Sequence, residues 1–189
     1  MKLLIALLLL SPGFISAQII TFPIDNVSQG LISKADWDSF NAKTVFHAPE
    51  LTWNDYAARP YGDEKVIAMT AYIIHFETSY EGYNARYTVT PEFDAGRSFT
   101  RTSDLSVLEH ERLHFKLALL YSRLIQNAIA PYQNKPESKE PERIYDSLCA
   151  KLKKMQALYD RETDNARNKK LQAIWERNIG AELRRLNGD

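Results

Sequence analysis

Apolar side chains fall on nearly every side of a helix drawn through residues 105–129. A helix with this pattern is typical of the buried centre of a domain. Asp104 stands directly before the stretch and is a residue type favoured as an N-cap. Pro131 ends the pattern, because proline cannot continue a helix. We therefore predict one central helix, with apolar positions at Leu105, Val107, Leu108, Phe115, Leu117, Leu119, Leu120, Leu124, Ile125 and Ile129.

Two stretches ahead of this helix have the character of β-strands. Residues 66–77 are rich in β-branched and aromatic side chains, and apolar residues alternate with polar ones in residues 85–93. A turn at residues 81–84 separates them, so we predict an antiparallel pair. Pro91 suits an edge or the end of pairing, because proline lacks the N–H that a central strand would donate.

A second helical segment is predicted after the central helix, over residues 142–186. Its apolar positions between residues 144 and 159 step by three or four. A polar connection with three prolines, residues 131–141, precedes it, and one break is expected near residues 163–168. The pattern predicts an α+β domain over residues 51–186, with a small antiparallel sheet packed on the buried helix.

The N-terminus follows a different pattern. A short basic start, an apolar run over residues 3–10 and a small-residue end predict a secretory signal peptide, residues 1–17, cleaved after Ala17. The apolar run is too short to span a bilayer, so no membrane span is expected in the mature chain. A lead-in, residues 18–50, follows, with a short strand expected at 19–22 and a helical turn at 35–42. These features predict export to the periplasm or the cell exterior.

Charge and cysteine content narrow the classes of function. Lys plus Arg and Asp plus Glu both number 24, which gives no electrostatic reason to expect nucleic acid or an anionic membrane as a partner. The single cysteine, Cys149, excludes an internal disulfide. We interpret it as a helix residue with no redox role.

The segment His110-Glu111-Arg112-Leu113-His114 carries the clearest chemistry. On a helix, His110 and His114 lie one turn apart on the same face, where two imidazoles can bind one Zn²⁺. From the position after the first histidine, Glu111 can act as general base on a metal-bound water. The alternative is that these are ordinary helix residues that make hydrogen bonds. His47 and His75, the other two histidines, are not assigned a catalytic part.

A zinc site needs a third protein ligand, and the second helical segment offers three acids. Asp160 is the first choice, followed by Asp164 and then Glu162. Asp160, Thr163 and Asp164 share one helix face, so Asp164 or Thr163 can support a ligand from behind. Tyr159 is either a donor to a developing oxyanion or a core aromatic. The alternative for each acid is a solvated helix face.

At these residues the chain resembles a bacterial family of exported proteins, domain-of-unknown-function family nine-two-two, whose members are expected to be zinc-dependent proteases. Three blocks carry the resemblance: residues 51–56, residues 93–123 and residues 159–175. The resemblance implies a zincin-like fold, in which a second helix brings the third ligand. Family members often have Gly where Leu113 stands and His where Asn165 stands, so Asp160 or Asp164 would have to replace a histidine ligand.

Three functions follow from these patterns. The first is a zinc metallopeptidase that hydrolyses peptide bonds, with His110, His114 and Asp160 on the metal and an extended substrate paired along residues 87–93. The second is a non-catalytic envelope protein that keeps the zincin scaffold and binds a partner, which the loss of histidine at Asn165 favours. The third is a plain helical structural protein. The sequence does not predict an oligomeric state.

Overall fold

The computed structural model describes residues 50–187 of the chain, and the signal peptide and nearly all of the lead-in predicted for residues 1–50 lie outside them. The described part is α+β, as the sequence predicts. Its elements are η1 (Trp53–Asp55), β1 (Ala68–Met69), β2 (Tyr72–Glu81), β3 (Asn84–Phe93), β4 (Phe99–Thr100), α2 (Leu105–Ile129), η2 (Ala130–Tyr132), α3 (Glu140–Thr163) and α4 (Lys169–Asn187).

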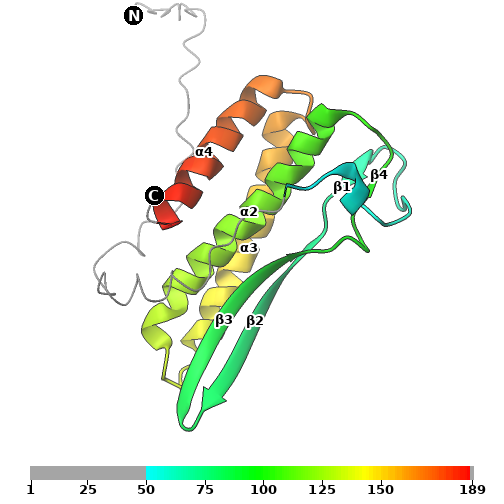
Figure 1. The fold of residues 1–189 in the computed structure, drawn as a ribbon. Coiled ribbons are helices and arrows are strands. Elements are labelled where there is room, and N and C mark those ends of the chain that lie inside the picture. Colours follow the sequence, from blue (N-terminus) through cyan, green and yellow to red (C-terminus); the bar gives the residue numbers. More distant parts are fainter. Residues whose placement is uncertain (1–49, 188–189) are drawn as a thin grey trace, which may run out of the picture.

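The central helix is α2, with the predicted bounds. The Asp104 carboxylate accepts a hydrogen bond from the Ser106 N–H at 2.8 Å, which confirms the predicted N-cap. Of its 25 residues, 17 are buried. The helices α3 and α4 pack against it, and the β2–β3 hairpin runs along its length (Figure 1). The core therefore surrounds α2 on several sides.

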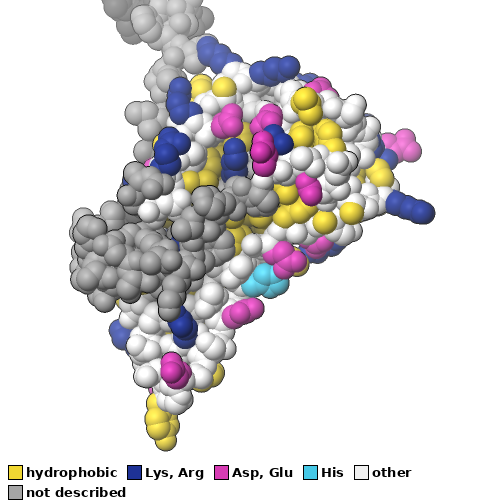
Figure 2. All heavy atoms as spheres, in the orientation of Figure 1, with side chains coloured by type: hydrophobic (Ala, Val, Ile, Leu, Met, Phe, Trp, Pro, Cys, Tyr) yellow, Lys and Arg dark blue, Asp and Glu magenta, His cyan; other side chains and the backbone are white. Residues whose placement is uncertain are grey.

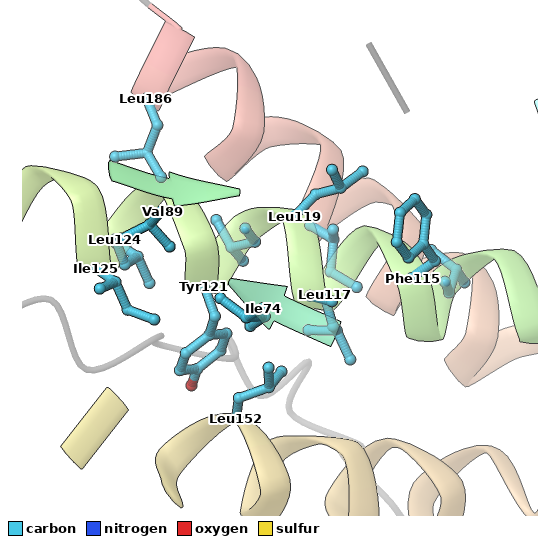
Figure 3. Close-up of a cluster of buried hydrophobic side chains, with 14 of the residues drawn as sticks. Ile74, Val89, Phe115, Leu117, Leu119, Tyr121, Leu124, Ile125, Leu152 and Leu186 are labelled. Atoms are coloured by element: carbon cyan, nitrogen blue, oxygen red, sulfur yellow. The ribbon is translucent and has the colours of Figure 1, made fainter. Parts of the chain in front are cut away.

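The core is built from side chains that α2 directs toward each neighbour. Leu117, Leu120, Ile125 and Ile129 on α2 are fully buried. Figure 3 shows α2 side chains meeting Ile74 and Val89 of the hairpin, Leu152 of α3 and Leu186 of α4. Each such side chain contributes about 1.5–3 kcal/mol by leaving water, so α2 is where burial stabilises the fold most.

The hairpin forms as predicted, with β2 and β3 paired over their full length and the turn at Gly82-Tyr83. Gly82 has φ 62°, which suits the first turn position of a two-residue hairpin loop. Pro91 pairs with Ile74. The N–H of Val89 points out of the hairpin, and residue 91, two positions on, faces the same way. Pro91 therefore stands where no N–H is needed within the pair.

The single strand predicted over residues 66–77 is wrong, because the chain changes partner in its middle. β1 pairs with β4, whereas β2 pairs with β3. Between them, the N–H of Ala71 donates to the buried Ser98 Oγ at 2.9 Å, and the Ala71 carbonyl accepts from the Asp94 N–H at 3.0 Å. These side-chain and loop hydrogen bonds satisfy the backbone at the point of exchange.

The second helical segment is two helices, and the predicted break near residues 163–168 is confirmed. α3 begins at Glu140, earlier than the predicted residue 142, because Pro141 fits the first turn of a helix, where no N–H is required. Cys149 lies half-buried on α3 against the core. Within residues 50–187, no helix combines the length and the apolar character that a membrane crossing needs.

We predict that Asp104→Ala lowers the free energy of unfolding by about 1 kcal/mol, because the first turn of α2 loses its side-chain acceptor. Urea unfolding followed by circular dichroism measures the change. Asp146→Ala is the matched control, because Asp146 is an exposed residue inside α3 with no cap to lose. Equal stabilities of the two variants would contradict the capping role.

Candidate metal centre

His110 and His114 extend from the same face of α2 with their side chains in contact. Their ring centroids lie 4.7 Å apart, and the two Nε2 atoms are 3.1 Å apart. His110 is buried, with 3% of its surface exposed. The one-turn spacing in the sequence thus brings two imidazole nitrogens to one point, as the motif predicts.

Asp160 reaches the same point from α3. Its Oδ1 atom is 2.8 Å from His114 Nε2 and 3.2 Å from His110 Nε2. The three atoms therefore form a triangle with sides of 2.8, 3.1 and 3.2 Å. Ligand atoms held 2.0–2.1 Å from a tetrahedral Zn²⁺ are about 3.3 Å apart. The triangle has nearly the size of one face of such a site.

Hydrogen bonds to the far side of each imidazole settle which ring nitrogen is free. The Gln156 amide donates to the His114 carbonyl at 2.9 Å, so its Oε1 accepts from His114 Nδ1 at 2.6 Å. The Thr163 hydroxyl donates to the Tyr159 carbonyl at 2.7 Å and accepts from His110 Nδ1 at 3.4 Å. In the neutral imidazoles both Nδ1 atoms therefore carry the proton, and both Nε2 atoms turn a lone pair toward Asp160. A second proton, on Nε2, would instead be donated to the Asp160 carboxylate.

Three electron-rich atoms this close together repel one another unless a cation lies among them. The pKa values of His114 and Asp160 also indicate that the centre favours positive charge. Burial acts to lower the pKa of His114, but the Asp160 hydrogen bond and the Glu111 and Asp160 charges outweigh it and raise that pKa. Burial acts to raise the pKa of Asp160, but hydrogen bonds from both histidines hold it well below its usual range. The centre therefore favours positive charge, whether as a proton or a metal ion.

Glu111 completes the centre from α2. It is buried, with 5% of its surface exposed, and its Oε2 atom has no hydrogen-bond partner within residues 50–187. A ligand atom from each of His110, Glu111 and His114 lies within 4.8 Å of the others, so this group could hold a metal ion. A buried carboxylate oxygen without a partner is costly, and a bound cation or a metal-bound water would satisfy it.

Tyr159 supports the histidines from behind. Its ring stacks on His110 with centroids 4.5 Å apart, and its hydroxyl donates to the His110 carbonyl at 3.3 Å. The side chain is fully buried. Its hydroxyl is therefore committed to the helix backbone, and the structure does not place it to donate to an oxyanion.

The other two acids considered as third ligand, Asp164 and Glu162, turn away from the histidines. Asp164 lies past the end of α3 with a left-handed backbone, and its exposed carboxylate forms an ion pair with Arg167 at 2.8 Å. Glu162 accepts a hydrogen bond from Trp175 Nε1 at 2.9 Å. Neither is therefore a ligand or a support of one. Asp164 follows the end of the helix and no longer obeys helical spacing, and Glu162, two residues after Asp160, lies on a different side of α3.

Of the other two histidines, His75 lies away from the centre. His75 pairs with Glu92 at 2.6 Å on the outer face of the hairpin. His47 lies outside the described residues.

A groove with a cavity volume of about 780 Å³ opens onto the centre. One wall is the segment 65–70, which includes β1, and the other contains Asp160, Asn165 and Arg167. Exposed apolar side chains gather around β1, β4 and the start of α2 (Figure 2). Val66 and Ile67, just before β1, and Leu105, the first residue of α2, are exposed. The groove thus has an apolar rim beside a polar floor.

Residues 87–93 were expected to pair with a substrate, but their outward edge is already occupied. The Gln133 carboxamide accepts from the Tyr87 N–H and donates to the Tyr87 carbonyl, both at 2.9 Å. Gln126 accepts from the Val89 N–H at 2.8 Å. Side chains from α2 and from the end of η2 thus close this edge, which the alternation of residues along the strand does not reveal.

The edge that faces the groove belongs to β1. The Arg101 N–H donates to the Ile67 carbonyl at 2.7 Å, and Ala68 lies opposite Thr100. Hydrogen-bonded and non-hydrogen-bonded pairs alternate in an antiparallel ladder, so the N–H and C=O of Ala68 point away from β4. A second strand can pair with β1 at this residue.

Sequence reasoning overlooked Gln156 and the segment 65–70. Gln156 lies one helical turn before Asp160 on α3, so the same spacing that pointed to Thr163 would have included it. No sequence pattern marks the segment 65–70, because its role comes from its position above α2.

Neither a family model, nor a curated protein, nor a solved structure matches this chain.

We predict that Gln156→Leu weakens binding of a divalent transition metal about 10–100-fold, because His114 loses the acceptor that orients its ring. Competition with a chromogenic chelator measures the affinity. Gln133→Leu is the matched control, since it removes a carboxamide bonded to β3 and should leave metal affinity unchanged. Equal affinities in both variants would show that Gln156 does not orient the ligand.

Proposed function

We propose that this protein is a zinc-dependent peptidase with a zincin-like fold. His110, His114 and Asp160 hold Zn²⁺, and Glu111 is the general base. The observation that carries the proposal is the convergence of two imidazole nitrogens and a carboxylate oxygen, all within 3.2 Å of one another. Beside them lies Glu111 Oε2, which has no hydrogen-bond partner among the described residues.

The donor set favours zinc. Imidazole nitrogens with one carboxylate oxygen are a common ligand set for catalytic zinc, which keeps a fourth position for water. Asp160 suits the third position better than Glu111 does, because one of its oxygens already contacts both imidazoles. Zinc bound here would lower the pKa of its water and polarise a substrate carbonyl.

Glu111 and the groove supply the remaining chemistry. Glu111 takes the proton of the attacking water and passes it to the leaving amine, which the burial of its carboxylate assists by removing competing solvent. An extended peptide pairs with the N–H and C=O of Ala68, which point away from β4, and this pairing brings the peptide backbone across the centre. Val66, Ile67 and Val107 offer apolar contacts to its side chains.

The fold and the N-terminus support the same proposal. A small sheet precedes the helix with the two histidines, and the next helix brings the third ligand, which is the arrangement that the resemblance implies. A signal peptide in residues 1–17, which the sequence pattern predicts, would export the protein, so its substrate would be a peptide of the periplasm or the cell exterior.

We predict that the purified protein binds one Zn²⁺ per chain and that His110→Ala, His114→Ala and Asp160→Ala each abolish stoichiometric binding. Metal analysis after dialysis measures the content. Asp164→Ala is the matched control, because Asp164 is an acid four residues from Asp160 that faces solvent. Zinc-free wild-type protein would refute the metal site.

We predict that the protein cleaves peptides in an unbiased library and that Glu111→Gln lowers kcat/KM about 10²–10⁴-fold while zinc content is unchanged. Loss of a general base contributes about 10²–10⁴-fold. Mass spectrometry of the library identifies the products. Bound zinc with no cleavage by the wild type would favour the non-catalytic scaffold that binds a partner.

A further inference from the structure

The turn between α3 and α4 has an unusual backbone. Asp164, Asn165 and Ala166 have φ values of 50°, 49° and 74° in succession. Asn and Asp tolerate the left-handed region, but Ala does so at a cost of about 1–2 kcal/mol. A strained segment persists only where its surroundings enforce it, and such segments cluster at functional sites.

Specific contacts hold this turn beside the metal centre. The Asn165 N–H donates to the Asp160 carbonyl at 2.9 Å, and the Asn168 N–H donates to the Thr163 carbonyl at 2.7 Å. The Ala166 side chain is buried in a small cluster with Ala68 of β1 and Val107 of α2. The turn is thus fixed to both helices that carry the centre and to the open edge strand.

Asn165 is the residue that this arrangement presents to the groove. It lines the groove and is exposed. Within residues 50–187 its carboxamide makes no hydrogen bond, whereas the neighbouring Asp164 and Arg167 side chains pair with each other. A carboxamide offers a donor and an acceptor together, which matches the N–H and C=O of an extended peptide residue.

The molecule already uses this pairing elsewhere. Gln133 contacts the N–H and C=O of Tyr87 at the outer edge of β3, both at 2.9 Å. Gln126 also donates to the Tyr87 carbonyl, at 3.3 Å. Side-chain carboxamides thus bind the backbone of β3 on the edge that faces away from β2. A peptide strand paired with Ala68 along one edge would present the N–H and C=O groups of its other edge without a partner strand, as β3 does.

We propose that the Asn165 carboxamide binds the backbone of an extended peptide in the groove, on the wall that faces β1. It is a binding residue that recognises the peptide main chain and leaves the choice of side chains to the apolar rim. The identity of the ligand as a peptide rests on the proposed function, but the contact itself does not require cleavage.

The test measures peptide binding in zinc-loaded Glu111→Gln protein, so that hydrolysis does not interfere. A library of decapeptides, acetylated and amidated at their ends, supplies the tightest binder as the probe. Adding Asn165→Gly, which suits a φ of 49°, should raise the Kd about tenfold, with zinc content and Tm unchanged. Asn134→Gly is the matched control, because Asn134 has φ 64° but follows η2 and does not line the groove.

A scan with N-methylated peptides locates the contact. Methylation at the residue that Asn165 contacts should weaken binding to Glu111→Gln protein but cause little further loss once Asn165→Gly is present. Equal Kd values with and without Asn165→Gly, or no peptide bound at all, would overturn the proposal. Tight binding that depends on Asn165, with no cleavage by the wild type, would support the contact and reject the peptidase activity.

Discussion

The burial of α2 on several sides is the constraint on which the rest of the structure depends. A helix with 17 buried residues needs cover from neighbours, and the hairpin, α3 and α4 all pack against it. The same burial decides the chemistry of its polar residues. Imidazoles and a carboxylate that are removed from water need hydrogen-bond partners. The elements that pack against His110, Glu111 and His114 supply these partners and so determine the chemistry of the three side chains.

The partners of the two histidines come mostly from α3, and they leave both Nε2 atoms facing Asp160. Gln156 accepts a hydrogen bond from His114 Nδ1, and Thr163 accepts one from His110 Nδ1. The Tyr159 ring stacks on His110. These contacts satisfy the Nδ1 atoms of both imidazoles. What remains is a pair of imidazole lone pairs directed at Asp160, together with a Glu111 oxygen that has no hydrogen-bond partner in the part of the chain that the structure describes. Such a set is stabilised by a cation, which connects helix packing directly to metal chemistry.

The segment ahead of the hairpin fixes α2 from the opposite side. Arg112 donates to the Leu51 carbonyl at 2.6 Å, and Tyr56 contacts the Thr70 hydroxyl at 2.9 Å. The Thr70 hydroxyl in turn contacts the Glu111 carbonyl at 3.1 Å. These hydrogen bonds therefore fix the position of the segment 65–70 relative to residues 110–114 of α2. This position, with the strained turn after α3, creates the two walls of the groove.

The sequence by itself determined the elements whose signals are local. The bounds of α2, its Asp104 cap, the hairpin and the break between α3 and α4 follow from periodicity, capping and turn chemistry, which act between residues close in the chain. The pairing of His110 with His114 is local for the same reason. Only the tertiary structure decided that Asp160, and neither Asp164 nor Glu162, meets these histidines. Asp164 lies past the end of α3 at Thr163, and Glu162 faces Trp175 of α4. The tertiary structure likewise decided that β1 is open and β3 is closed, since Gln126 and Gln133 reach β3 from residues about forty positions later in the chain. Contacts of that kind depend on how the elements pack, which no pattern of neighbouring residues encodes.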